Sequence, residues 1–109
     1  MGVDVALVCV EQNGSSPRRR RVRQVDVVLD LRDEFARLCE SSELPMLSRV
    51  DPYGTLKLGS REMGQFISEI NAEFSRTEEH GVQEILQGVL RLARECQDRD
   101  EMELRLDGD

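Results

Sequence analysis

Few residues of this chain have both the type and the spacing that catalysis requires. His80 is the single histidine. At the positions three and four residues away, its only charged neighbours are Arg76 and Glu84. A catalytic base needs a nucleophile beside it, and the spacing indicates none. We therefore interpret His80 as a solvated surface histidine.

The cysteines do not form a metal-binding pattern. There are three of them, Cys9, Cys39 and Cys96, at wide spacing. The absence of a CxxC pair or a Cys/His cluster excludes the familiar zinc sites. Because each cysteine lies in or beside an apolar pattern, we expect reduced, buried thiols in a cytosolic protein. One disulfide with a spare thiol is the alternative.

Carboxylate pairs are present, but they lack further metal ligands. Glu69 and Glu73 lie four residues apart in an expected helix, without a histidine or a third ligand nearby. We therefore predict no metal site. Neither GxGxxG nor GxxxxGK[ST] occurs, so no cofactor is predicted. An enzyme would need a deep pocket lined by groups such as Glu69, Glu73 or Tyr53, and we predict that the protein is not an enzyme.

An arginine run is the most unusual local feature of the sequence. It comprises Arg18, Arg19, Arg20, Arg21 and Arg23. Such a run is typical of phosphate or nucleic-acid contacts. Against this, the net charge is −7, and one Tyr, three Phe and no Trp leave little for base stacking. The other interpretation is an exposed strand edge whose charge prevents edge-to-edge pairing.

Negative charge is concentrated in the second half of the chain. Residues 56–109 hold seven basic and thirteen acidic groups. A negative field repels nucleic acid and attracts basic partners. The leading prediction is a non-enzymatic protein-binding module whose acidic helical surface and one exposed turn bind a basic protein partner. Its candidate residues are Asp51, Tyr53, Glu78, Glu79 and Glu84. The alternative is a nucleic-acid or phosphate-binding protein that uses the arginine run.

Strands are predicted from short apolar or alternating stretches. Val3–Val10 and about Arg19–Leu29 flank an Asn-Gly turn, which favours a hairpin. Met46–Val50 and Thr55–Leu58 flank Asp51-Pro52-Tyr53-Gly54, a type I turn pattern, and predict a second hairpin. Alternation over residues 102–106 predicts a closing strand with one wet face.

Helices are predicted from apolar residues spaced three and four apart. The first is expected after Asp30 as N-cap, with Leu31, Phe35 and Leu38 on its apolar face. Ser60 and Thr77 are the expected caps of two further helices. Residues 1–109 are therefore expected to form a single α+β domain, with a mainly antiparallel sheet of about five strands, three helices on one face, and the order ββαββααβ.

The sequence also bears on location and assembly. No basic segment precedes the first apolar run, and no run reaches the roughly 18 residues of a membrane span. We therefore expect a cytoplasmic protein without a membrane partner. Exposed hairpin edges pair easily, so homodimerisation stays open.

Three stretches of the sequence resemble those of a known group of proteins. They are Val50–Thr55, Leu92–Cys96 after an amphipathic helix, and the closing Leu104–Asp109. Through them the chain, from about Val3 onward, resembles a group of small, uncharacterised and mostly actinobacterial proteins. In size and charge it is similar to immunity proteins of bacterial toxin systems. The resemblance implies protein binding and assigns no active residues.

Overall fold

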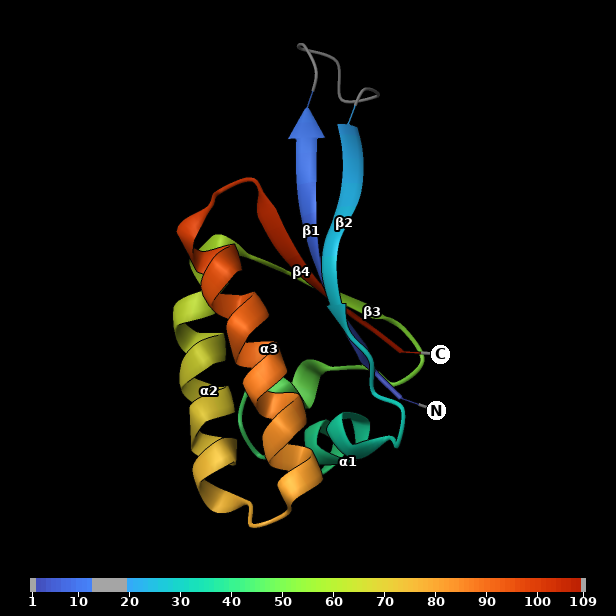
Figure 1. The fold of residues 1–109 in the computed structure, drawn as a ribbon, viewed down its shortest axis with the longest axis vertical. Coiled ribbons are helices and arrows are strands. Elements are labelled where there is room, and N and C mark those ends of the chain that lie inside the picture. The colour runs from blue at the N-terminus through green and yellow to red at the C-terminus, as the bar shows by residue number, and fades with distance from the viewer. Residues whose placement is uncertain (1, 13–19, 109) are drawn as a thin grey trace.

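The structure is a computed structural model that describes residues 2–12 and 20–108. Over these residues the chain forms four strands and three α-helices, and its fold class is α+β as predicted (Figure 1). The strands are β1 (Asp4–Gln12), β2 (Arg20–Val28), β3 (Thr55–Gly59) and β4 (Met102–Asp107). The helices are α1 (Glu34–Ser41), α2 (Met63–Arg76) and α3 (His80–Asp98).

The strands form a single antiparallel sheet in the order β2-β1-β4-β3. β1 is central, and Val5 in it pairs with Val28 of β2 and with Leu106 of β4. The sequence pattern of β1, apolar on both faces, predicts a central strand, and β1 is central in the sheet. β2 and β3 are the edge strands.

The helices pack on one face of the sheet, and the core lies between the two layers (Figure 1). Val5, Leu7 and Cys9 of β1 point into that core. Ala6 and Val8 are also buried, but they lie outside the core cluster, on the opposite face. The helices contribute the apolar stripes read from the sequence, with the largest buried side chains at Phe35, Phe66, Ile70, Leu86 and Leu92.

The predicted fifth strand is wrong. Residues Met46–Val50 do not form half of a hairpin, because Leu47–Arg49 is a 3₁₀ helix, η2. Its backbone amides are held by a distant side chain, since Glu69 accepts hydrogen bonds from the N–H groups of Met46 and Leu47. The observed order is therefore ββαβααβ, one strand fewer than expected.

The helix starts differ in detail from the predicted caps. α1 begins at Glu34, yet the Asp30 carboxylate still accepts the N–H groups of Phe35 and Ala36 in its first turn. The expected place of Leu31 on the apolar face of this helix is wrong, because Leu31 precedes the helix and is exposed. A short 3₁₀ helix, η3 (Ser60–Glu62), precedes α2. Thr77 lies three residues before α3, where its hydroxyl accepts the N–H of Glu79 at 3.2 Å.

The β1–β2 hairpin extends beyond the rest of the sheet (Figure 1). β4 pairs with β1 only from Asp4 to Cys9, whereas β2 continues to pair as far as Gln12. A register shift between Leu7 and Val8 marks a bulge in this ribbon. The predicted hairpin is thus confirmed over the described strands, while Arg18, Arg19 and the expected turn lie outside the described residues.

All three cysteines are buried free thiols, as expected. Burial is the main cause that raises the pKa of the Cys96 thiol to about 11, and it raises the pKa of Cys39 still further. Both groups are therefore protonated and unreactive at neutral pH. Among the described helices, none is long and apolar enough to cross a membrane.

Candidate protein-binding surface

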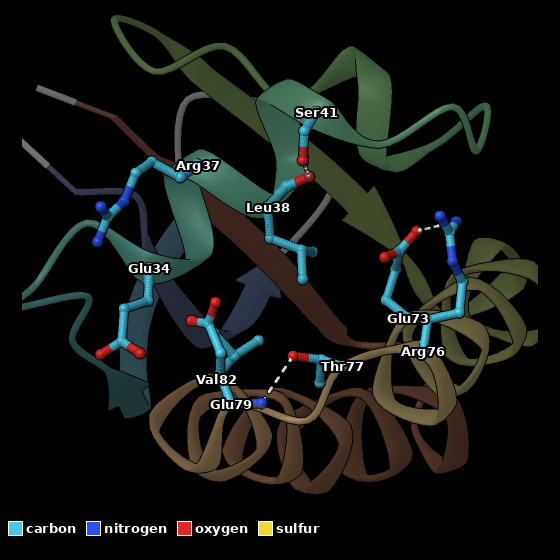
Figure 2. Close-up of a pocket in the computed structure, with 9 residues that line it drawn as sticks. All are labelled: Glu34, Arg37, Leu38, Ser41, Glu73, Arg76, Thr77, Glu79 and Val82. Carbon is cyan, nitrogen blue, oxygen red and sulfur yellow. Dashed lines mark hydrogen bonds and ion pairs between the residues drawn. The ribbon is translucent and has the colours of Figure 1, made fainter.

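Two hollows meet at the corner where α1 faces the start of α3. The first, of about 380 Å³, lies between all three helices (Figure 2). It is lined by Glu34, Arg37, Leu38, Ser41, Glu73, Arg76, Thr77, Glu79 and Val82. Figure 2 shows Leu38 pointing from α1 toward the helix pair, across from Val82. The hollow thus has an apolar floor with charged groups around it.

The end of α2 builds one wall of this hollow. Glu73 is 8% exposed, and its carboxylate accepts a hydrogen bond from the Ser42 hydroxyl at 3.2 Å. The Arg76 guanidinium lies 3.5 Å from the same oxygen (Figure 2). The Glu73 carboxylate is therefore bonded to neighbouring residues of the protein.

The loop between α2 and α3 builds the opposite wall. Glu79 immediately precedes α3, and the Thr77 hydroxyl holds its backbone N–H, which fixes the turn between the helices. The Glu79 side chain is exposed and has no ion pair with any described residue. Glu78, next to it, is exposed as well. These carboxylates are free to meet a ligand.

The second hollow is a groove of about 400 Å³ between the β2–α1 loop and α3. Leu29, which is 52% exposed, and Leu31, which is 85% exposed, stand on its rim. Ile85 and Glu84 line it from α3. Large apolar side chains at this exposure, beside a groove, are a common mark of an interaction surface.

Glu34 belongs to both hollows. Its carboxylate lies against Gly81, where a Cβ atom would collide with it. Glu34, Glu79 and Glu84, which we call the acidic corner, surround the apolar side chains of the two hollows.

His80 lies on the outside of this corner. Its Nε2 is 3.1 Å from a Glu84 oxygen, and both side chains are largely exposed. This agrees with the interpretation of His80 as a surface residue. Since the pair is solvated, it adds only a few tenths of a kcal/mol to stability.

Asp51 and Tyr53 lie apart from the acidic corner. They form the turn before β3, where Asp51 accepts the Tyr53 N–H at 2.8 Å and its carbonyl accepts the Gly54 N–H. Gly108, just after β4, donates to the Gly54 carbonyl. Tyr53 is 73% exposed, but neither hollow includes this turn. The structure thus divides the predicted binding residues between two places.

The sequence did not reveal that Glu69 is buried. This residue is 6% exposed and accepts hydrogen bonds from the amides of Met46 and Leu47 and from Gln65. The i, i+4 spacing with Glu73 was its only signal, and that spacing is equally typical of a solvated helix face. Among the described residues, no group of three or more His, Cys, Asp or Glu is arranged to hold a metal ion.

The described part of the arginine run lies on the projecting hairpin. Arg21 and Arg23 are exposed, and neither makes an ion pair with a described residue. Their positions face Glu11 and Cys9 across the ribbon. Alternate residues of a strand point to the same face of the sheet, so both arginines lie on the face that carries the core. They lie in the part of the hairpin that extends past the pairing of β1 with β4.

Comparison of the chain with protein families, with curated proteins and with solved structures found no match. The resemblance to small actinobacterial proteins and the similarity to immunity proteins therefore stay predictions.

Proposed function

We propose that the protein is a non-enzymatic binding module and that its acidic corner binds a basic segment of a protein partner. The observation that carries the proposal is the meeting of exposed carboxylates and exposed leucines at one place. Glu79 lines the first hollow, Glu84 and the exposed Leu31 line the second, and Glu34 belongs to both. Charge there would speed association, and the apolar groups would supply the buried contact.

The partner segment that fits has lysine or arginine flanking an apolar anchor. An apolar side chain can enter between Leu38 and Val82 or against Leu31 and Ile85. Basic side chains beside it then meet Glu34, Glu79 and Glu84.

The Asp51–Tyr53 turn has a lesser part in this proposal. Because it lies outside both hollows, contact with the same short segment is not required of it. A partner large enough to extend along the molecule would use exposed Tyr53 as a further contact.

The proposal is tested by titrating isotope-labelled protein with a synthetic basic peptide, of about 15 residues, that contains leucine anchors among lysines and arginines. Amide shifts are expected around Glu79, Val82 and Glu84, and affinity should fall as salt rises. The double variant Glu79→Lys and Glu84→Lys should bind at least about tenfold more weakly.

The matched control is Glu40→Lys and Glu43→Lys, which changes exposed carboxylates outside both hollows. Equal loss of affinity in both double variants would show that only overall charge matters. Shifts located elsewhere, or none at low salt, would reject the acidic corner as the binding surface.

A second candidate function is favoured by the projecting hairpin. Its exposed arginines, Arg21 and Arg23, extend the run of Arg18, Arg19 and Arg20, and would meet the phosphates of a nucleic acid. Replacing Arg21 and Arg23 by alanine should then lower affinity for a short DNA or RNA duplex and flatten its salt dependence. Undetectable binding at about 50 mM salt would exclude this function.

We propose that the protein is cytoplasmic. The support is the state of Cys9, Cys39 and Cys96, which are buried free thiols rather than disulfides.

A further inference from the structure

A third hollow, of about 250 Å³, lies between the two 3₁₀ helices and the first turn of α2. It is lined by Pro45, Met46, Arg49, Arg61, Glu62 and Gln65. None of these residues lines either hollow of the acidic corner. A ligand in this third hollow is therefore independent of the proposed binding function.

Each 3₁₀ helix brings one arginine to this hollow. Arg49 is the last residue of η2, and Arg61 is the middle residue of η3. Both are exposed, and neither makes an ion pair or a side-chain hydrogen bond with a described residue. Two positive charges thus border the hollow without a partner in the described part of the chain.

The carboxylates close to these arginines in the fold are bonded to backbone amides instead. Among the residues that line the hollow, Glu62 is the only acidic one, and it accepts the Gly59 N–H at 3.1 Å. Buried Glu69 accepts the N–H of Met46 at 2.9 Å. Two arginines and one glutamate give the hollow a net charge of +1, in a chain whose net charge is −7.

The same hydrogen bonds hold the hollow in shape. Glu69 accepts the N–H groups of Met46 and Leu47, which fixes η2, and it also accepts a hydrogen bond from the Gln65 amide nitrogen at 2.9 Å. The Glu62 bond to Gly59 fixes the start of η3. Because the backbone of both arginine-bearing segments is held in place before a ligand binds, less ordering is needed on binding.

We propose that this hollow binds a phosphomonoester, whose phosphate group contacts Arg49 and Arg61. Such a group carries a charge of about −2 at neutral pH, which matches two arginines. Guanidinium groups bind phosphate through paired N–H donors. Pro45 and Met46 offer apolar surface to the carbon body of the ester. The hollow is smaller than the roughly 300 Å³ at which most ligand pockets begin, so that body is short.

The test is a titration of isotope-labelled protein with phenyl phosphate at constant ionic strength. Saturable shifts are expected in the amides of Met46, Arg49 and Arg61. Inorganic phosphate, which lacks the ring, and phenol, which lacks the phosphate, should each bind at least about fivefold more weakly. Arg49→Gln and Arg61→Gln should each lower the affinity for phenyl phosphate about tenfold.

Arg94→Gln is the matched control, since Arg94 is exposed on α3, outside this hollow. Its affinity for phenyl phosphate should stay within about twofold of the unmodified chain. An equal loss in Arg94→Gln would overturn the proposal, because overall charge alone would explain the binding. Shifts that do not saturate, or that lie away from the hollow, would overturn it as well. Equal affinity for inorganic phosphate would exclude an ester as the ligand.

A short phosphoserine peptide distinguishes the two sources of a phosphomonoester. Tighter binding of the peptide than of phenyl phosphate would place the ester on a protein side chain. The opposite order would place it on a small molecule. Both results support the site, provided that Arg49→Gln and Arg61→Gln weaken the binding.

Discussion

Two glutamates of the same hollow have opposite surroundings. Glu73 is buried and is bonded by Ser42 and Arg76, whereas Glu79, on the facing wall, is exposed and makes no ion pair with a described residue. Both are acidic residues in or next to a helix of the acidic half. The difference separates carboxylates that are bonded inside the protein from exposed carboxylates, to which we assign surface recognition in the proposed function.

The internal group includes Asp30 and Glu69, which accept backbone N–H groups from other elements. Because such hydrogen bonds to a charged acceptor are strong, and an unmet buried N–H is costly, these residues should matter for stability. The exposed group should matter little for stability and much for binding.

The largest effect on the free energy of unfolding is expected at Asp30. It accepts N–H groups from Val3, Phe35 and Ala36, and so joins the start of β1 to the start of α1. Asp30→Ala should lower the free energy of unfolding by about 3 kcal/mol. Urea denaturation measures the loss, and Asp30→Asn, which keeps an acceptor oxygen, should lose less. A change below about 0.5 kcal/mol in Asp30→Ala would contradict this role.

The second largest effect on the free energy of unfolding is expected at Glu69. Its replacement by alanine leaves the amides of Met46 and Leu47 without their acceptor, and we expect a loss of about 2 kcal/mol. Hydrogen exchange should show earlier opening of the segment around η2. If η2 keeps its protection in Glu69→Ala, the account of the missing strand fails.

Asp51 provides an intermediate case, since it is exposed but still accepts the Tyr53 N–H. Asp51→Ala should cost about 1 kcal/mol, measured by thermal unfolding. A cost as large as that of Asp30→Ala would show that burial is not what separates the two groups.

The smallest effect on stability is expected at Asp26. The hydrogen bond from the Val27 N–H is the main cause that lowers the pKa of this carboxyl, and the bond from Arg91 lowers it further. Its contribution to stability is therefore complete above the ordinary aspartate pKa and is lost as pH falls through the lowered value. In an NMR titration, Arg91→Met should raise the Asp26 midpoint. An unchanged midpoint would exclude the ion pair as a cause.

Local patterns predicted most of the fold. Alternation and apolar stripes located four strands and three helices, and Asp30 was expected to serve the first helix. Met46–Val50 was misread because five residues with apolar ends fit a strand or a turn of helix, and the deciding contact comes from Glu69. The sequence also could not predict which glutamates are buried and which are exposed, because this depends on how α1, η2 and α2 pack.

The most direct test compares Glu73→Gln with Glu79→Gln for both unfolding free energy and affinity for the basic peptide. We predict that Glu79→Gln weakens binding and changes stability by less than about 0.5 kcal/mol. Glu73→Gln should lower stability by about 1 kcal/mol and leave the affinity of the folded protein nearly unchanged. The reverse pattern, or equal effects of both substitutions on both quantities, would contradict the account.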